Sequence, residues 1–333
     1  MNARGEILDL DRVVEHVIAG QELARDVARK LLNYPDGRLQ DLLRATLKVR
    51  ERSFGRRVKI CMLNNAQSGI CPEDCGYCSQ SKISRADIPV YKLKSVGALV
   101  DGARQAVDSG ARRYCVVCSM RGPTDAVVEH LGEACERVRA QFPALEICLS
   151  LGLMSESQAR ALKHGGAGWV NHNLNTSRRF YPKICTTHTY DDRVRTVENV
   201  RNAGLSTCCG GILGMGEGDD DVLDLAYATR RLRIDSVPIN FLHPIAGTPL
   251  GQMSALTPQK CLKAACVFRL LNPTSEIRAA GGRELNLGVR QSEIFNAVNS
   301  IFVNGYLTTP GLGYAQTLAL IERAGFEPEP QNL

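Results

Sequence analysis

The hydrophobic pattern of the chain changes near residue 57. Before that point apolar residues recur at helical spacing, as at Leu10, Val13 and Val17. After it, short apolar runs alternate with longer amphipathic segments. The pattern therefore predicts an N-terminal helical extension over residues 1–56 and an α/β domain over residues 57–333.

Eight short apolar runs in the second part are typical of buried β-strands. They span residues 57–63, 112–118, 144–150, 168–173, 206–213, 235–241, 275–280 and 300–304. Helical segments are expected at 95–110, 125–142, 155–165, 190–204, 219–233, 257–272, 283–295 and 313–325. Strict alternation implies a parallel sheet, and eight units predict a (β/α)₈ TIM-type barrel. A doubly wound open sheet is the alternative. A barrel would place the chemistry at the carboxyl ends of its strands.

Composition and charge narrow the class of protein. The chain has 44% hydrophobic and 23% charged residues, which is typical of a globular protein and excludes disorder and collagen-like repeats. No uncharged apolar run approaches the ~18–20 residues that span a bilayer, and the N-terminus carries acidic residues where a signal peptide would be apolar. We therefore expect a cytoplasmic protein without a membrane partner.

Basic residues form two groups along the chain. One lies at 50–57 and the other at 230–233, and acidic residues lie close to the second. The net charge is +6. Both groups are interpreted as solvated helix faces, because a nucleic-acid site needs basic residues clustered on one face. No nucleic-acid partner is expected.

Thirteen cysteines are the unusual feature of the composition. Disulfides are rare in the cytosol, and an odd number of cysteines cannot all pair within one chain. The thiols are therefore expected to be core residues, metal ligands or reactive groups.

Three cysteines follow the first predicted strand in a C-x₃-C-x₂-C pattern: Cys71, Cys75 and Cys78. Thiolates favour zinc or iron–sulfur clusters. A structural zinc site needs a fourth ligand, and no second cysteine pair follows. Three cysteines suit a four-iron cluster that leaves one iron free for a small molecule. An aromatic residue, Tyr77, directly precedes the third cysteine, which is the expected place for an aromatic residue in such a motif.

This motif resembles the signature of the radical S-adenosylmethionine superfamily. The resemblance implies a [4Fe-4S] cluster on Cys71, Cys75 and Cys78. It also implies S-adenosylmethionine as a cofactor, which the cluster cleaves to a 5′-deoxyadenosyl radical.

Three further cysteines lie inside predicted strands. Cys115, Cys148 and Cys208 belong to the second, third and fifth strands, and Arg278 lies in the middle of the seventh. A buried, unpaired guanidinium is costly. In a barrel these four side chains could share one interior and form a second metal centre. Ordinary buried cysteines are the alternative.

From about residue 55 the chain resembles the biotin synthase family. The resemblance is carried by GICPEDCGYCSQS (69–81), YCVVCSMRGP (114–123), EICLSLGLMSESQA (146–159), VNHNLNTS (170–177), CCGGILGMGE (208–217), SVPINFLHPIAGTPL (236–250), EIRAAGGRE (276–284) and NSIFVNGYLTTP (299–310). It implies a second iron–sulfur cluster, of the [2Fe-2S] type, on Cys115, Cys148, Cys208 and Arg278. That cluster would donate sulfur to dethiobiotin to form biotin.

The resemblance also implies contacts to small molecules. For S-adenosylmethionine these are Tyr77, Asn173, Asn175 and Ile212, and for dethiobiotin they are Asn171, Asn240, Thr308 and Thr309. Period-two alternation independently places Asn171, Asn173 and Asn175 on one side of a strand. Asn175 matches a position that is aspartate in some relatives, so this contact is expected to be weaker or differently made. Ile212 belongs to a G-x-I-x-G-x-x-E element at 210–217, which lacks dinucleotide-binding spacing.

The sequence also leads to expectations about protein partners and leaves alternative functions open. The resemblance implies an electron donor such as flavodoxin or ferredoxin, and a homodimer. A related radical enzyme similar to the hydrogenase maturase, and a non-catalytic iron–sulfur or zinc-binding protein, are the alternatives. His172 and His188 are expected to be structural. The remaining cysteines are expected to fill the core, with Cys118 and Cys209 left open as substitute ligands; the set is Cys61, Cys118, Cys135, Cys185, Cys209, Cys261 and Cys266.

Overall fold

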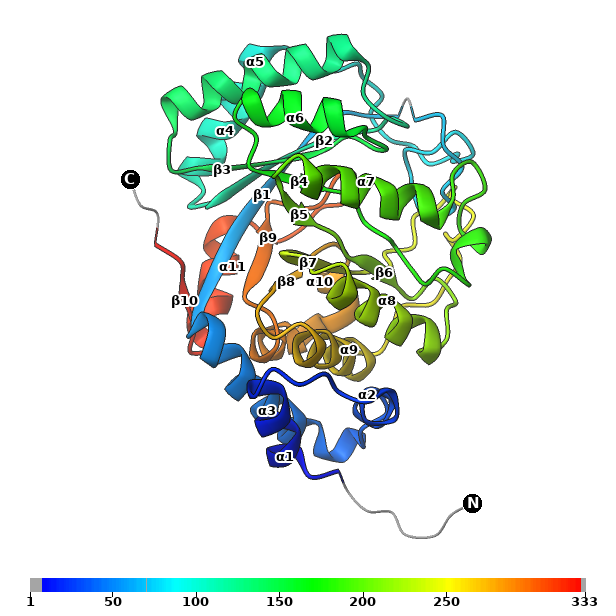
Figure 1. Cartoon of the computed structure of the whole chain (residues 1–333), viewed down its shortest axis with the longest axis vertical. Coiled ribbons are helices and arrows are strands. Elements are labelled where there is room, and N and C mark those ends of the chain that lie inside the picture. The colour runs from blue at the N-terminus through cyan, green and yellow to red at the C-terminus, as the bar shows by residue number, and fades with distance from the viewer. Residues whose placement is uncertain (1–7, 70, 331–333) are drawn as a thin grey trace.

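The computed structural model describes residues 8–69 and 71–330, and its centre is a closed parallel β-barrel (Figure 1). The strands of the barrel are β1 (Arg57–Gln67), β2 (Arg113–Cys118), β3 (Glu146–Ser150), β4 (Trp169–Asn171), β5 (Ser206–Cys208), β7 (Ser236–Phe241), β8 (Glu276–Ala279) and β9 (Ser300–Val303). Each pairs in parallel with the next, and β9 pairs back with β1. The predicted TIM-type barrel is confirmed, and the open-sheet alternative is wrong.

Helices surround the barrel, as Figure 1 shows. They are α4 (Val96–Asp108), α5 (Asp125–Gln141), α6 (Glu156–His164), α7 (Tyr190–Asn202), α8 (Asp219–Arg231), α9 (Pro258–Leu271), α10 (Arg283–Leu287) and α11 (Tyr314–Arg323). A short 3₁₀ helix, η2 (Tyr181–Lys183), precedes α7, and β10 (Glu327–Pro328) pairs with the start of β1. None of the helices within 8–69 and 71–330 is both long and apolar enough to cross a membrane.

The fifth predicted strand, 206–213, is wrong as one unit. It is divided into β5 and a separate strand, β6 (Gly211–Leu213), which also pairs with β7. At the break, a Cβ atom added to Gly210 would lie 1.9 Å from the carbonyl oxygen of Pro238. The backbone of the β5–β6 corner therefore approaches β7 too closely for any side chain at this position.

Two other boundaries differ from the prediction by more than two residues. β1 continues to Gln67, so residues 64–67, expected in a loop, extend the first strand toward the cavity described below. The helix predicted at 283–295 ends after α10, where Gly288 has a φ of 51°. A 3₁₀ helix, η3 (Gly288–Asn296), follows. Glycine tolerates this left-handed φ and ends the α-helix there.

The N-terminal helices pack on one side of the barrel. They are α1 (Leu10–Ile18), α2 (Arg25–Leu32), the 3₁₀ helix η1 (Asp36–Arg38) and α3 (Leu39–Phe54). They lie against α8, α9 and η3, below α9 in Figure 1. The division into two domains at residue 56 stays a prediction.

Arg50 contradicts the interpretation of residues 50–57 as a solvated basic face. It is fully buried at the end of α3. Its guanidinium donates to the backbone carbonyl oxygens of Val298, Gly55 and Arg57. Burial lowers the pKa of Arg50 to about 10. This basic residue therefore joins α3 to the barrel.

Candidate active site

The carboxyl ends of the strands surround a cavity of about 280 Å³. Its lining includes the loop after β1, the inner faces of β2, β3 and β8, and the loop after β9. This is the end of the barrel at which chemistry was expected, and most of the predicted site residues lie there.

The cysteines of the C-x₃-C-x₂-C loop, Cys71, Cys75 and Cys78, all line this cavity. Burial raises the pKa of Cys78 to about 11 and that of Cys71 above its ordinary value. Without a metal the thiols of Cys71 and Cys78 are therefore mainly protonated at neutral pH, whereas coordination to iron stabilises the thiolate. Three convergent, desolvated thiols therefore fit an iron–sulfur cluster.

The residues between the cysteines anchor the loop to the segment at 184–188. Asp74 accepts hydrogen bonds from the backbone N–H groups of Thr186 (2.9 Å) and Thr187 (3.1 Å). The backbone N–H of Gly76 donates to the carbonyl oxygen of Ile184 at 2.9 Å. Accepted hydrogen bonds hold the pKa of Asp74 well below its usual range although burial opposes the shift. The acidic residues of the motif thus hold the loop rather than extend the thiol set.

The second predicted set meets inside the barrel. Cys115 of β2 lies opposite Cys148 of β3 in the strand register, and both line the cavity together with Arg278. Cys208 lies directly beside them, 3.6 Å from Nη1 of Arg278. All four side chains are buried. The structure therefore brings together the four residues that the sequence distributes over β2, β3, β5 and β8.

Charged side chains are buried next to this inner site and hold Arg278 in place. Glu276 accepts two hydrogen bonds from Arg113, at 2.9 and 3.1 Å, and also contacts Arg278 and Lys59. Burial would raise the pKa of Glu276, but the three cations hold it well below its usual range. Arg278 is fixed by this carboxylate and by the hydroxyls of two serines, Ser236 and Ser300, each at 3.1 Å.

Hydrogen bonds and nearby charges shift the pKa values of the inner thiols. A hydrogen bond with Cys148, together with the nearby Arg278 and Arg113, lowers the pKa of Cys208 to about 5. The pKa of Cys148 is raised well above its ordinary value by its hydrogen bonds with Cys115 and Cys208. The three thiols therefore form one hydrogen-bonded group beside the guanidinium of Arg278.

Sequence reasoning missed part of this environment. Cys61 of β1, expected to be an ordinary core residue, packs in the same buried cluster as the inner cysteines, and its Sγ lies 3.4 Å from Oγ of Ser300. Of the two cysteines left open as substitutes, Cys118 lines the cavity and Cys209 packs in the outer core. Nothing in the local pattern distinguishes Cys61 from other strand cysteines.

The predicted asparagine row also lines the cavity. Asn171 donates to Oδ1 of Asn173 at 3.1 Å and lies 3.2 Å from Sγ of Cys208. Asn175 donates to the hydroxyl of Tyr77 at 2.6 Å. All three asparagines face the cavity, but strand alternation is not the reason, because β4 ends at Asn171 and Asn175 has a φ of 69°. They connect the inner thiols with the loop of the first three cysteines.

The remaining predicted contact residues lie around the same cavity. Ile212, Thr308 and Thr309 all line it, and the hydroxyl of Thr308 lies 2.8 Å from that of Ser79. Asn240 also lines it, but its amide is bonded to the backbone at both ends, to Gly211 O and Gly281 N, each at 3.0 Å. Asn240 therefore ties β6 to the end of β8 as well as facing the cavity.

Arg193 was not singled out from the sequence, where it is one charged residue of an expected helix. In α7 its side chain is buried and lines the cavity. It donates to the carbonyl oxygen of Asn173 (2.8 Å), to Nε2 of His188 (2.8 Å) and to the hydroxyl of Tyr181. It is a fixed positive charge close to the first cysteine loop.

Comparisons with known proteins agree with this geometry. Residues 67–226 match the Radical SAM superfamily, and residues 238–327 match the Biotin and Thiamin Synthesis associated domain. The barrel with a three-cysteine loop at its mouth is therefore that of a radical S-adenosylmethionine enzyme, which carries an iron–sulfur cluster.

Close relatives specify the family further. The chain is 48% identical to the biotin synthase of Thermus thermophilus over 97% of both chains, and 46% identical to that of Geobacillus thermodenitrificans over 96% of this chain and 97% of the relative. It is 44% identical to that of Bacillus subtilis over 95% and 94% of the two chains. The chain belongs to the biotin synthase family.

Solved structures support the fold. A methylornithine synthase superposes with a TM-score of 0.82 at 22% identity, covering 96% of this chain and 98% of that one. The FeFe-hydrogenase maturase HydG of Carboxydothermus hydrogenoformans gives 0.80 at 17% identity, covering 96% and 79%. At these identities the likeness shows the fold alone. The maturase-like and non-catalytic alternatives are not supported.

Proposed function

We propose that the chain catalyses the insertion of sulfur into dethiobiotin to form biotin, with S-adenosylmethionine as the source of the radical. The observation that carries this proposal is the presence of two separate thiol groups at one barrel mouth. One group is on the loop after β1, and the other is deeper, on the inner faces of β2, β3 and β5 beside Arg278. Membership of the biotin synthase family supports it.

Two bound groups would supply the chemistry that side chains lack. Acid–base residues cannot break unactivated C–H bonds at neutral pH, so a cofactor must do so. A [4Fe-4S] cluster on Cys71, Cys75 and Cys78 would supply the electron that cleaves S-adenosylmethionine to a 5′-deoxyadenosyl radical.

A second, [2Fe-2S] cluster would supply the sulfur from the deeper site. Its proposed ligands are Cys115, Cys148, Cys208 and Arg278. Glu276 and the two serines orient Arg278, so the chain presents a fixed guanidinium to this site. Two separate centres in one cavity suit a reaction that needs a radical and a sulfur atom within reach of one substrate.

The chain's own residues would bind and orient the two small molecules. Asn171 touches both the inner thiol of Cys208 and Asn173, so it lies where dethiobiotin would meet the sulfur site. Asn173, Asn175, Tyr77 and Ile212 are proposed for S-adenosylmethionine. Thr308, Thr309 and Asn240 are proposed for dethiobiotin. Arg193, a buried cation at the first cysteine loop, is suited to the carboxylate of S-adenosylmethionine.

The test is anaerobic reconstitution of the full chain with iron and sulfide. Addition of dethiobiotin, S-adenosylmethionine and a reductant should give biotin and 5′-deoxyadenosine. Formation of 5′-deoxyadenosine without biotin would reject dethiobiotin as the substrate. An iron content that corresponds to a single cluster would reject the two-centre arrangement.

Asn175 offers a test of the proposed cofactor contact. Its backbone has a φ of 69°, which aspartate also tolerates, and its amide donates to Tyr77. In Asn175→Asp the carboxylate can accept from Tyr77 and still accept a ribose hydroxyl in a charge-assisted bond. The KM for S-adenosylmethionine should fall about fivefold, or ~1 kcal/mol, with kcat unchanged. Asn175→Ala should raise KM, and equal KM values for both variants would contradict the contact.

The electron donor of the flavodoxin or ferredoxin type, the homodimer and the cytoplasmic location stay predictions. The first two rest on the family resemblance and the third on composition. Pull-down with each reduced carrier and measurement of the molar mass in solution would test the first two.

A further inference from the structure

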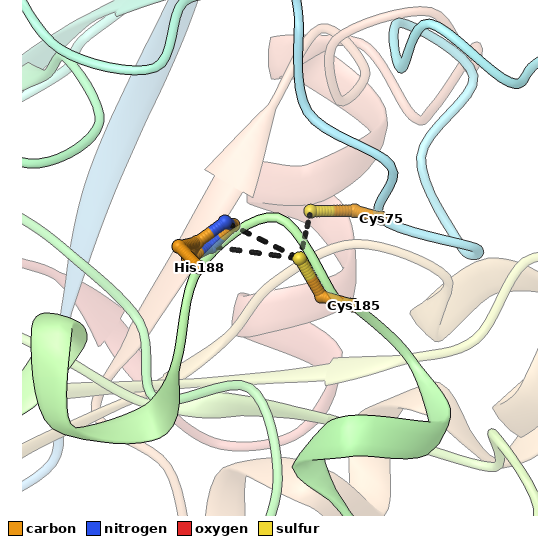
Figure 2. Close-up of side chains that lie close together, drawn as sticks. All are labelled: Cys75, Cys185 and His188. Carbon is orange, nitrogen blue, oxygen red and sulfur yellow. Dashed lines mark hydrogen bonds between the residues drawn. The ribbon is translucent and has the colours of Figure 1, made fainter.

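Cys185 is a buried thiol that the proposed reaction does not use. It follows η2, and its Sγ lies 3.7 Å from Sγ of Cys75. Figure 2 shows the two side chains next to each other. Both side chains are at most 7% exposed. The two residues are 110 positions apart in the sequence, so the contact is made by the fold and not by local spacing.

Contacts on both sides fix this pair of sulfur atoms. The backbone N–H of Gly76, next to Cys75, donates to the carbonyl oxygen of Ile184, next to Cys185, at 2.9 Å. Asp74 lies 3.2 Å from Sγ of Cys185 and also accepts from the backbone of the same segment. The two thiols are therefore held face to face by the loops that carry them.

His188 completes the cluster but is not arranged as a metal ligand. Its Nε2 lies 2.8 Å from Nη2 of Arg193, and a guanidinium can only donate, so Nε2 is the acceptor. Nδ1 then carries the hydrogen, and it faces Glu73 at 2.5 Å and Cys185 at 3.2 Å (Figure 2 shows the latter). Neither ring nitrogen offers a free lone pair. The group is a pair of thiols with an N–H donor beside it.

We propose that Cys185 is the oxidative partner of Cys75, so that the chain without its first cluster closes a Cys75–Cys185 disulfide. A disulfide bond is about 2.05 Å long, and the sulfur atoms must therefore approach by only ~1.7 Å. Side-chain rotation within two adjoining loops supplies a movement of that size. Transient, redox-sensing disulfides of this kind are the ones found in reducing compartments.

The two thiols have different access, which sets the order of the steps. Cys75 lines the cavity, whereas Cys185 is not part of its lining. Hydrogen peroxide that enters the cavity oxidises the Cys75 thiol to a sulfenic acid and releases one water. The Cys185 thiol then attacks that sulfur, and the S–O bond breaks to release a second water. The two thiols lose two electrons and two protons, and one peroxide takes up both.

The disulfide protects a proposed cluster ligand. A sulfenic acid that finds no thiol proceeds to sulfinic acid, which is irreversible, whereas a disulfide is reduced by thiols. Cys185 thus keeps Cys75 in a form from which the first site can be rebuilt.

The linkage can be measured on the full-length, cluster-free protein. It is treated with one equivalent of hydrogen peroxide, alkylated, digested and analysed by mass spectrometry. A Cys75–Cys185 linked peptide is expected, and it should disappear after treatment with dithiothreitol. Pairing among Cys71, Cys75 and Cys78 with Cys185 alkylated would overturn the proposal. So would unpaired oxidation of Cys75.

Variants give a second readout that is independent of biotin formation. After peroxide and then dithiothreitol, Cys185→Ser should carry sulfinic acid at Cys75. Its uptake of iron and sulfide, followed by visible absorbance and iron content, should recover at least threefold less than that of the wild type. Cys135→Ser, which changes a buried thiol of α5, is the matched control and should recover like the wild type. Full recovery of Cys185→Ser would contradict the proposal, whatever substrate the enzyme uses.

Discussion

Cys208→Ala should reduce biotin formation by at least about 100-fold while leaving the first cysteine site able to take up its cluster. The Cys208 thiol is buried beside Arg278 and hydrogen-bonds with Cys148, so its loss removes a proposed ligand of the sulfur-donating site. The loop of Cys71, Cys75 and Cys78 is a separate set and keeps its anchors. Cleavage of S-adenosylmethionine should therefore persist.

The adjacent residue provides the control. Cys209 follows Cys208 in the chain but packs in the outer core, away from the inner thiols. Cys209→Ala should cost about 1 kcal/mol of stability and retain biotin formation. Iron per chain should fall in Cys208→Ala and not in Cys209→Ala. Equal loss of biotin in both variants, or loss of all iron in Cys208→Ala, would contradict the assignment.

Glu276→Gln should lower the free energy of unfolding by about 3–5 kcal/mol. The carboxylate is buried and faces Arg113, Arg278 and Lys59. Glutamine keeps the shape but leaves the fully buried Arg278 without its carboxylate partner, and Arg113 with Glu146 alone. Denaturant unfolding of the cluster-free chain measures the loss.

The loss of stability caused by Glu276→Gln should become smaller at low pH. The pKa of Glu276 is depressed in the folded chain, so its stabilising contribution is complete above the unfolded pKa of about 4.3. It is lost as pH falls toward the folded pKa, because the carboxylate must then be protonated. The difference in stability between wild type and Glu276→Gln should be constant above about pH 5 and shrink below about pH 4.

Glu146→Gln is the matched control for this variant. Glu146 pairs with the same Arg113 and Lys59, but its side chain is 27% exposed. Water can replace part of its interaction, so the expected loss is about 1 kcal/mol. If the two glutamine variants were equally stable, the burial argument for Glu276 would be wrong.

The barrel could be predicted because short segments rich in apolar residues alternate regularly with amphipathic helices along the chain. The division of the fifth strand at Cys209-Gly210 could not, because it depends on a carbonyl oxygen of β7 that the local sequence does not contain. The early end of α10 falls at Gly288, a residue type that commonly ends helices, so this boundary is readable from the sequence.

The site residues that could be predicted are likewise those that form a local motif, whereas long-range contacts could not be read from the sequence. Cys71, Cys75 and Cys78 form a contiguous motif, and the strand cysteines with Arg278 acquire meaning once a barrel is assumed. Cys185 could not be placed in this way, because its neighbour is 110 residues away and no spacing relates them. Arg193 was equally invisible, since a buried and a solvated arginine look alike in an amphipathic helix.

Two close backbone approaches to β7, one at the β5–β6 corner and one after β8, limit how this sequence can diverge. A Cβ atom at Gly210 would lie 1.9 Å from the carbonyl oxygen of Pro238, and one at Gly282 would lie 1.9 Å from that of Phe241. Every amino-acid replacement at either codon adds at least this atom, and no side-chain rotation can move it. Divergence at these two positions is therefore confined to synonymous codons unless the neighbouring strand shifts as well. A mutational scan would find them intolerant of alanine as well as of larger residues.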